Sequence, residues 1–400
     1  MRESFVCEDN CPVCLSPKTI IFLYLYDVPV LSNIMYPSIR EAIQALRGDI
    51  HLGVCQNCGH IYNTVFDAKM VNYSQHYENT LFFSPLFLQY GETLSENLIH
   101  RYDLIQKDII AIGCGRGDFL KLLCAKGGNR GIGFDPSLVV EEAESNMSEQ
   151  IRFIRDYYKT DYAHYPVDLL VCRHVLEHIE NVRDFLTEIR QIIGDRQPVV
   201  YFEVPNVLSY FRDQVNWDII YEHYSYFSPI SLEKVFTDCG FQVARLYPSF
   251  GGQFLSLEAL PAREQKEPKP DSLNNLHDIN EICRLAVRFA LHLGKAVEEW
   301  RYKLQYLRIT GKKAVIWGTG SKGVNFLNMV DRERVVKYAI DINPFKCGHH
   351  VAGTGQKIMP PDFLMDYQPD EVIVMNPIYL EEIRETIERL GIKTELTPSG

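Results

Sequence analysis

One short string gathers a carboxylate pair, an imidazole and three phenols: residues 218–227 read Asp-Ile-Ile-Tyr-Glu-His-Tyr-Ser-Tyr-Phe. Histidine titrates near neutrality, so His223 is a natural base for removing a proton from a carbon beside a ketone. Glu222 could assist the imidazole, and Tyr221 could position or polarise the oxygen as an enolate forms. A purely structural interpretation, in which Glu222 and His223 cap and bridge helices, stays open from the residues alone.

Two tyrosines earlier in the chain could add hydroxyls to the same chemistry. Tyr73 and Tyr77 stand four positions apart. On a helix that spacing would place both hydroxyls on one face, where they could meet a common cavity. The alternative is that both rings are half-buried packing residues.

Two Cys-x-x-Cys pairs, Cys11 with Cys14 and Cys55 with Cys58, predict a metal site. Two such pairs can give four thiolates to a tetrahedral zinc ion, and four sulfur ligands leave no open position, so we expect a structural site. The alternatives are unmetallated buried thiols or a redox pair, and Cys7 is a spare thiol nearby. The chain has 11 cysteines and no secretion signal, which argues against a disulfide framework.

A glycine-rich loop at residues 113–117 indicates a nucleotide site. An apolar run at 109–112 precedes Gly113, Gly115 and Gly117, and a helical pattern follows. The next apolar run, 131–134, ends on Asp135, an acid that such sites use to hold ribose hydroxyls. The Gly-x-Gly-x-Gly spacing resembles the S-adenosylmethionine (SAM) loop of class I methyltransferases, although an ordinary strand-to-helix turn is the alternative.

Further residues acquire roles from this resemblance. Asp156 follows the apolar run 151–154, where an acid of this fold can accept a hydrogen bond from the adenine amino group. His174 follows the expected strand at 167–172, at the carboxyl edge where open α/β sheets bind ligands, and would lie near the sulfonium. His178, one turn further on, is expected to pack or cap. Asn206 ends the expected strand at 199–204.

A second glycine loop follows the apolar run 313–317 and reads Gly318-Thr319-Gly320-Ser321-Lys322-Gly323. This is a true Gly-x-Gly-x-x-Gly, and a later run at 335–340 ends on Asp341, so in isolation it predicts a dinucleotide site for NAD. The start of the following helix also offers backbone donors for a phosphate, with Lys322 beside it. Asn376, after the expected strand 371–375, could face a cleft between domains.

The order of these features resembles the sugar C-methyltransferases that act on nucleotide-linked keto-deoxysugars. The features are the cysteine pairs, an Asn-x-x-Phe-Asp turn at 63–67, Tyr-x-x-x-Tyr, Ser-Pro at 84–85, the SAM loop and the Glu-His string. The resemblance implies that His223 is the base with Glu222 beside it, and that Tyr77 or Tyr221 positions the oxygen. It assigns Ser84 to the cofactor site. It places the substrate against Tyr73, Asn206, Gly320, Ser321, Lys322 and Asn376, and it implies a C-terminal domain that helps to hold the nucleotide sugar and binds no NAD.

The string departs from the family pattern at specific positions. Ile220 stands where the family has tyrosine, and Tyr221 replaces a histidine. Phe250 precedes paired glycines where the family usually has histidine. Methylation of a sugar hydroxyl or amine therefore stays open beside carbon methylation, as does an NAD-dependent oxidoreductase or bifunctional enzyme.

The expected fold is α/β, with a zinc-binding module, a doubly wound class I methyltransferase sheet and a Rossmann-like C-terminal domain. The expected boundaries are 1–66 for the zinc module, 67–99 for a helical tyrosine-rich connector, 100–262 for the SAM-binding domain, 263–310 for a linker and bracing helix, and 311–400 for the substrate-binding domain. Apolar residues at helical spacing through 276–307 predict the brace, although a partner-binding amphipathic helix is the alternative.

Composition limits the partners. The formal charge is −11 without a dense Lys/Arg tract, so nucleic acid is not an expected partner. No apolar run approaches the length of a membrane span, and acidic residues stand where a signal peptide would be apolar. We expect a cytoplasmic protein that binds a nucleotide sugar and no membrane, as a monomer, with a dimer as the alternative.

Overall fold

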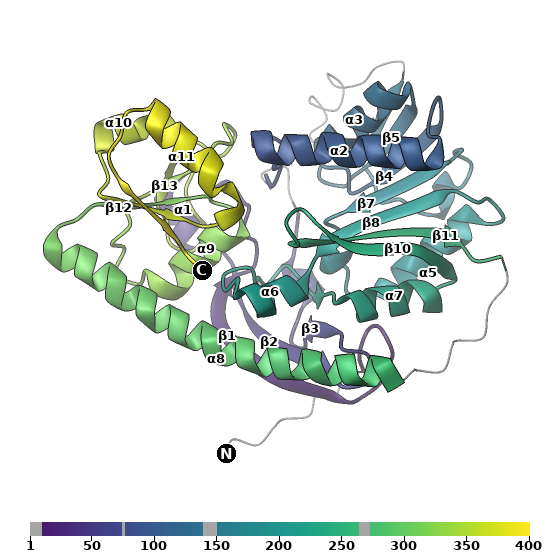
Figure 1. The fold of residues 1–400 in the computed structure, drawn as a ribbon, viewed down its shortest axis with the longest axis horizontal. Helices are drawn as coiled ribbons and strands as arrows, with labels where there is room; N and C mark the ends of the chain where they lie inside the picture. Colours follow the sequence, from purple (N-terminus) through teal and green to yellow (C-terminus); the bar gives the residue numbers. More distant parts are fainter. Residues whose placement is uncertain (1–9, 74–76, 139–149, 264–272) are drawn as a thin grey trace.

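The computed structural model describes residues 10–73, 77–138, 150–263 and 273–400, which form three sheets (Figure 1). Cys7 and most of the charged segment 263–272 lie outside these residues. The N-terminal sheet is antiparallel with the order β1-β2-β3-β9. Its elements are β1 (Thr19–Pro29), α1 (Ile39–Ile43), β2 (Arg47–Cys55), β3 (Ile61–Asn63) and β9 (Ser225–Tyr226). Since β9 belongs to the 218–227 string, the N-terminal module holds that string directly.

The central sheet has the order β10-β11-β8-β7-β4-β5-β6, and β11 is antiparallel to both of its neighbours while the other strands are parallel. This is the doubly wound class I methyltransferase sheet that the sequence predicts. Its strands are β4 (Asp108–Ile112), β5 (Arg130–Phe134), β6 (Ile151–Ile154), β7 (Leu169–Arg173), β8 (Val199–Pro205), β10 (Phe241–Ser249) and β11 (Phe254–Pro261).

Helices cover both faces of this sheet (Figure 1). One face of β4 packs Ile109 against α2 and α3, and the other packs Ile110 in the cluster with α5 and α7, so β4 is apolar on both sides. The helices and 3₁₀ turns of this region are η1 (Ala68–Met70), α2 (Pro85–Tyr102), α3 (Asp118–Gly127), η2 (Thr160–Tyr162), η3 (Leu176–His178), α5 (Val182–Ile193), α6 (Val207–Asp213) and α7 (Pro229–Asp238). Because α2 packs on α3, it belongs to the central domain although it crosses the boundary expected at residue 100.

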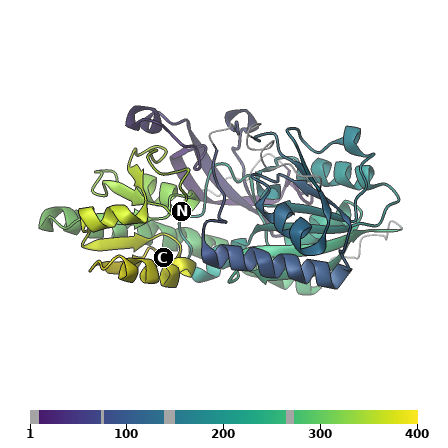
Figure 2. The same cartoon turned by 90° about the horizontal axis from the view of Figure 1, so that it is seen from above.

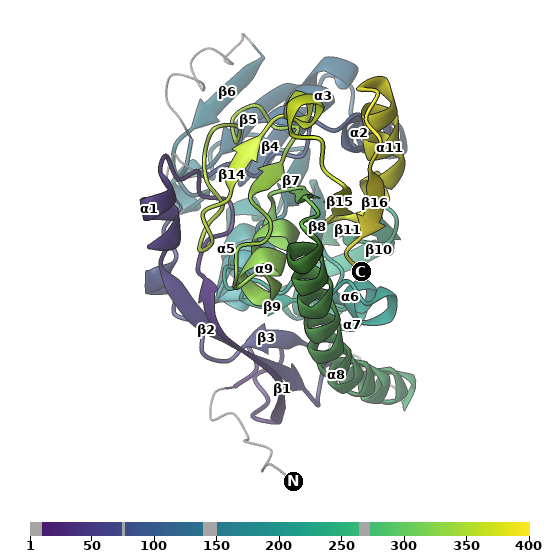
Figure 3. The same cartoon turned by 90° about the vertical axis from the view of Figure 1, so that its left-hand side faces the viewer.

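A single helix, α8 (Leu273–Thr310), runs from the central domain along the molecule to the C-terminal domain (Figures 1 and 3). It buries Ile282, Phe289 and Leu304 in one cluster shared with β1, α6 and α9. The helical periodicity of 276–307 therefore indicated this element correctly, and α8 braces the three parts of the chain.

The C-terminal sheet is wholly parallel with the order β14-β13-β12-β15-β16. Its elements are β12 (Ala314–Trp317), α9 (Ser321–Val330), β13 (Tyr338–Ile340), β14 (Lys357–Met359), η4 (Pro361–Phe363), α10 (Leu364–Tyr367), β15 (Glu371–Val374), η5 (Pro377–Tyr379), α11 (Leu380–Arg389) and β16 (Glu395–Pro398). This domain lies beside the central one, with the N-terminal strands across both (Figure 2). No helix within the described residues is both long and apolar enough to cross a bilayer.

Candidate active site and metal centre

One cavity of about 1040 Å³ joins the two glycine loops, the tyrosine segment and the 218–227 string. Most of the residues singled out in the sequence line it: Tyr73, Tyr77, Ser84, Gly113, Gly115, Asp135, Asp156, His174, His223, Gly320, Ser321, Lys322 and Asn376. The lining does not include Gly117, Asn206, Tyr221, Glu222 or the four cysteines of the two Cys-x-x-Cys pairs. The fold thus brings together residues that are up to three hundred positions apart.

The first glycine loop leaves room for a ligand at its centre. Gly113 and Gly117 have φ of 60° and 78°, and a Cβ would lie 2.2 Å from Val175 at the first and 2.4 Å from Phe153 at the second. At Gly115, with φ of 52°, a Cβ would meet nothing within 4 Å, because that face opens on the cavity. The loop therefore needs glycine for its own packing and presents bare backbone to a cofactor.

Two carboxylates follow the neighbouring strands at this edge of the sheet. Asp135, directly after β5, accepts the Gly115 N–H at 2.9 Å and so holds the loop against the strand. Asp156, after β6, accepts the Tyr162 hydroxyl at 2.7 Å, and hydrogen bonding from Lys159 lowers its pKa. Both carboxylates line the cavity where a nucleoside would extend from the loop.

His174 is held by a buried carboxylate. Its φ is 54°, and its Nε2 lies 3.0 Å from Glu203 Oε1, which also accepts the Arg173 guanidinium at 2.7 Å. Burial alone would raise the pKa of Glu203, but Arg173, His174 and the Tyr90 hydroxyl together outweigh it and keep that pKa well below its usual range. The resulting ion pair fixes the His174 ring at the cavity wall.

His223 is buried at the wall of the same cavity. Its side chain belongs to a residue only 8% exposed, and its ring contacts His178 with 4.8 Å between centroids. Burial lowers the pKa of His223 well below its ordinary value and the neighbouring His178 lowers it further, whereas Asp218 raises it. The imidazole is therefore neutral at pH 7, which is the state that a base requires.

Glu222 is joined to Tyr77. Its Oε2 accepts the Tyr77 hydroxyl at 2.6 Å, and its Oε1 accepts the Ser32 N–H at 2.9 Å. Burial raises the pKa of Glu222, and the hydrogen bond from Tyr77 opposes that rise. The sequence analysis placed Glu222 beside the His223 imidazole as its assistant, but the carboxylate whose field acts on that imidazole is Asp218.

Tyr73 completes this group through His178. The Tyr73 hydroxyl lies 2.7 Å from His178 Nδ1, and the Tyr73 and Tyr77 rings meet edge-on with 5.0 Å between centroids. The expected helical turn between these tyrosines includes residues 74–76, which lie outside the described residues, and Tyr77 forms an extended bridge with Ile34. His178 was expected to pack or cap, yet it lines the cavity.

The Tyr221 side chain is buried outside the cavity lining. It is 1% exposed, and its hydroxyl accepts the Asp67 N–H at 3.0 Å and donates to Met70 Sδ at 3.3 Å. The expectation that this hydroxyl could reach the substrate is therefore corrected, since it faces the N-terminal segment. Asn206 is likewise engaged outside the cavity lining, because it caps α6 and donates to Gly252 O at 2.9 Å.

The second glycine loop is tied to the 218–227 string. Ser321 Oγ and Lys322 Nζ each lie 2.7 Å from an oxygen of Asp218. Asp341, the acid of the dinucleotide pattern, accepts the Thr319 N–H at 3.0 Å and the Asn343 N–H at 2.9 Å. The sequence analysis quoted Asp218 within the string but assigned it no role, since sequence spacing does not reveal a partner 104 positions away.

Other predicted residues at the cavity also make contacts between domains. Asn376 exchanges hydrogen bonds with the Gln253 amide at 3.0 Å in each direction. Ser84 caps α2 and donates to Glu382 at 2.7 Å. These contacts hold the C-terminal domain against the central one around the cavity.

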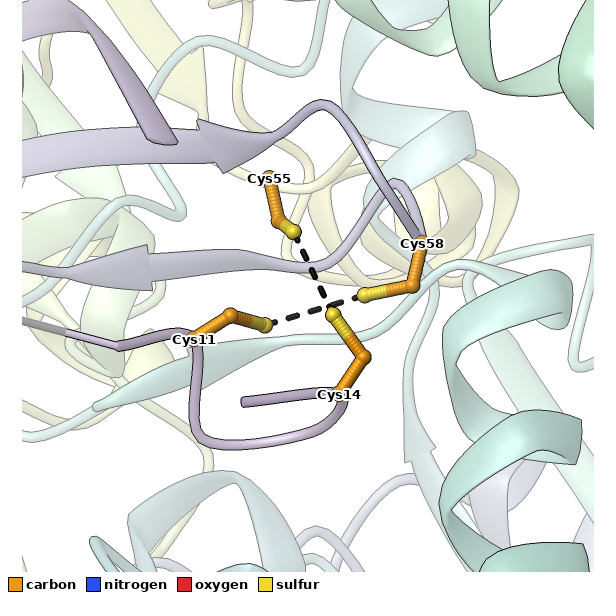
Figure 4. A group of neighbouring side chains, drawn as sticks. All are labelled: Cys11, Cys14, Cys55 and Cys58. Atoms are coloured by element: carbon orange, nitrogen blue, oxygen red, sulfur yellow. Dashed lines mark hydrogen bonds between the residues drawn. The ribbon is translucent and has the colours of Figure 1, made fainter. Parts of the chain in front are cut away.

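The four cysteines converge as the sequence predicts (Figure 4). Cys11 and Cys14 lie in the turn before β1, and Cys55 and Cys58 lie at the end of β2 and the turn after it. The Sγ atoms of Cys11 and Cys58 are 3.7 Å apart, and those of Cys14 and Cys55 are 3.5 Å apart. Four convergent sulfurs fit a structural zinc ion.

Two protein-family models match the chain. Residues 87–246 match a methyltransferase domain, and residues 257–393 match a C-methyltransferase C-terminal domain. The second match includes the whole Gly318–Gly323 loop, so it places that loop in a domain type found with C-methyltransferases. No curated protein matches the sequence.

Solved structures of methyltransferases resemble part of the chain. A SAM-dependent methyltransferase from Aquifex aeolicus is 13% identical over 45% of this chain and 95% of its own, with a TM-score of 0.36. The magnesium protoporphyrin IX methyltransferase from Synechocystis PCC 6803, solved with bound SAH, is 19% identical over 44% of this chain and 84% of its own, with a TM-score of 0.35. The central domain is assigned as a methyltransferase from its strand order and from the family models. The low TM-scores of these two structures do not contribute to that assignment.

Proposed function

Because the chain is a SAM-dependent methyltransferase with a C-methyltransferase C-terminal domain, we propose that it methylates a carbon of a nucleotide-linked keto-deoxysugar. The observation that carries this proposal is the His223 imidazole, which is buried, neutral at pH 7 and at the wall of the cavity that both glycine loops share. A neutral imidazole beside a cofactor loop suits removal of a proton from carbon.

The first glycine loop and its carboxylates would hold SAM, which supplies the methyl group. The open face at Gly115 admits the cofactor to the backbone, Asp135 takes the ribose hydroxyls, and Asp156 lies where the adenine would reach. His174 and Ser84 would border the same cofactor. A cofactor held at the loop would share one cavity with His223, which lines it as well.

His223 removes the proton beside the sugar ketone, and the imidazolium that forms is stabilised by the Asp218 carboxylate, which already raises the pKa of His223. Tyr77 is the hydroxyl that would position the ketone oxygen, because it lines the cavity. Its proton is donated to Glu222 in the free protein and would turn to the ketone oxygen when the substrate binds. Tyr73 stands beside it as a second substrate contact. The carbanion would then take the methyl group of SAM, with cleavage of the S–CH₃ bond and release of S-adenosylhomocysteine.

The C-terminal domain would hold the nucleotide part of the substrate. The start of α9, at Gly320 and Ser321, presents backbone N–H groups to the cavity, and Lys322 adds a positive charge. Asn376 borders the same space. The cysteine site contributes no chemistry, but a zinc ion there would fix the turn that leads from β2 to β3, and hence the β9 strand that follows His223.

The test is a panel of nucleotide-linked keto-deoxysugars incubated with SAM that carries a ¹³C-labelled methyl group. Carbon methylation gives a product whose new C–CH₃ bond NMR locates. Incubation in D₂O without SAM should exchange the sugar C–H beside the ketone, since enolisation precedes transfer. A methylated product with the label on oxygen or nitrogen, and no such exchange, would refute carbon methylation in favour of O- or N-methylation.

A further inference from the structure

Three side chains at the cavity wall present metal-binding atoms to one another. Glu177 and His178 come from η3, and His223 comes from the string before β9. One ligand-type atom from each lies within 4.8 Å of the other two. Ligands bound to zinc at about 2.1 Å lie roughly 3.4 Å apart in tetrahedral geometry, so small side-chain rotations would close this group on an ion.

The hydrogen bonds of His178 prepare one of its nitrogens for a metal. Its Nδ1 lies 2.9 Å from the carbonyl oxygen of Glu222 and 2.7 Å from the Tyr73 hydroxyl. The carbonyl can only accept, so the tautomer that satisfies it carries the proton on Nδ1, with the Tyr73 oxygen as a second acceptor. The lone pair is then on Nε2. Metal-binding histidines are commonly oriented in this way, with the second ring nitrogen donating to a carbonyl or a carboxylate.

The other two members have buried atoms without a partner. Among the described residues, neither His223 Nδ1 nor Glu177 Oε2 has a hydrogen-bond partner, and the two residues are 8% and 1% exposed. Such atoms are costly to bury unless something binds them. Both residues line the cavity, from which an ion could reach them.

Glu177 also lacks the positive charge that its neighbours have. Glu203 is paired with Arg173 and Asp218 with Lys322, both at 2.7 Å, whereas the ion-pair partner of Glu177 in the described chain is the His174 imidazole at 3.8 Å. A divalent cation would supply the missing charge. Two imidazoles and one carboxylate are a ligand set that zinc and related ions accept, and three ligands leave a position open to the cavity.

We propose that Glu177, His178 and His223 form a second metal site, for a divalent transition-metal ion, and that an ion bound there stops methyl transfer. The proposal that a metal ion binds here rests on the three residues alone. The inhibitory half rests on the proposed function, since a His223 imidazole that is bound to a metal cannot take a proton from the substrate.

Binding is tested with Co²⁺ on protein whose cysteine site is already loaded with zinc. The wild type should take up one further equivalent, with a visible d–d spectrum and no thiolate charge-transfer band. Glu177→Gln should weaken this binding about tenfold or more, and His178→Gln, should the first variant fold poorly, should do the same. Glu233→Gln, the same change at an exposed acid of α7 outside the cavity lining, is the matched control. No further equivalent in the wild type, or equal binding in both ligand variants, would overturn the site.

Inhibition is tested by titrating Zn²⁺ into the methyl-transfer assay. The wild-type rate should fall over the same Zn²⁺ range in which Co²⁺ uptake is displaced, and dialysis against zinc-free buffer should restore it. Full activity at saturating Zn²⁺ would refute inhibition while the Co²⁺ result still upholds the site. A failure of the metal-free wild type to methylate any keto-deoxysugar would instead count against the proposed function, and the Co²⁺ measurement does not depend on it.

Discussion

The Lys322 ammonium lies 2.7 Å from the Asp218 carboxylate and so joins the second glycine loop to the string that contains His223. The two side chains are 14% and 10% exposed. Burial by itself would raise the pKa of Asp218, but Lys322 outweighs that effect and holds the pKa at about 2. A lysine that the sequence analysis assigned to a substrate phosphate is thus also the contact that fixes the C-terminal domain beside the 218–227 string.

Lys322→Met should destabilise the junction between the domains. It leaves Asp218 buried without a cation, which costs about 3 kcal/mol, whereas the double variant with Asp218→Asn should recover most of that loss. Tryptophan fluorescence during denaturant unfolding reports this junction, since the Trp217 and Trp300 indoles both donate to Ser399 O, at 3.0 and 2.9 Å. Lys337→Met, at an exposed lysine of the same domain, is the control. A double variant as unstable as the sum of the two single ones would contradict a stabilising pair.

The same pair should make stability depend on acid. Because the pKa of Asp218 in the folded protein is about 2 and that of an unfolded aspartate is about 4, the pair contributes fully above pH 4 and is lost as the pH falls toward 2. The stability difference between the wild type and Asp218→Asn should therefore shrink from pH 5 to pH 3. Denaturant titrations at each pH measure it, and a difference that stays constant would rule out this assignment.

His223→Asn should abolish the chemistry and spare the cofactor. A positioned base contributes about a hundred- to ten-thousandfold, so kcat should fall by at least the lower figure while the Kd for SAM stays unchanged. Calorimetry gives the affinity and single-turnover assays give the rate. His164→Asn, at an exposed histidine, is the matched control. Near-normal turnover in His223→Asn would remove His223 as the base.

The pH profile offers an independent check on the same imidazole. Since burial lowers the pKa of His223 well below its ordinary value, the base stays neutral, and kcat should not decline near pH 6.5 but only at lower pH. Asp218→Asn should move the acid limb lower still, because Asp218 raises that pKa. An acid limb centred at pH 6.5 or above in the wild type would show that the titrating base is a more exposed group.

Cys58→Ser should release the zinc ion that we expect at the cysteine site and displace the catalytic string. Loss of one of four thiolates opens the structural site, and β3, which follows this turn, pairs with β9 directly after His223. Metal analysis should show about one zinc ion less per chain, with a lower melting temperature and reduced turnover. Cys347→Ser, in the C-terminal domain, should keep its zinc. A Cys58→Ser protein with full zinc content would refute the ligand set.

Local pattern was enough for the elements but not for their long-range contacts. The apolar run before Gly113 and the acid after the next run fixed β4, the loop and β5, because strand and turn signals are carried by neighbours in sequence. The cysteine cluster was readable for the same reason, since the spacing of zinc ligands is local within each pair. The 38-residue helix α8 followed from its apolar periodicity.

Side-chain partners could not be predicted in the same way. Glu222 and His223 are adjacent in sequence, and the resemblance made them a pair, yet the fold turns Glu222 toward Tyr77 and Ser32 and brings Asp218 near His223. Tyr221 directly precedes Glu222 in the sequence, yet its hydroxyl contacts the Asp67 N–H and does not line the cavity. Burial and tertiary hydrogen bonds decide these orientations, and sequence spacing does not contain them.

Matched glycine-to-alanine substitutions distinguish the roles of the two glycine loops in cofactor binding. Gly115→Ala puts a methyl group into the open face of the first loop and strains a backbone with φ of 52° by about 1–2 kcal/mol, so S-adenosylhomocysteine should bind about tenfold more weakly or worse. Gly320→Ala leaves ordinary backbone angles and its nearest new contact is 4.0 Å away, so cofactor affinity should persist. Thermal shift and calorimetry measure both variants.

Melting temperatures measured with NAD test whether the second glycine loop binds a dinucleotide. Ligand at a hundred times its Kd stabilises by about 2.7 kcal/mol, so S-adenosylhomocysteine should raise the melting temperature of the wild type and of Gly320→Ala. NAD should raise neither, because the second loop lies in the region that matches a C-methyltransferase C-terminal domain. A shift with NAD that disappears in Gly320→Ala would make the second loop a dinucleotide site, and the nucleotide sugar would then need another place to bind.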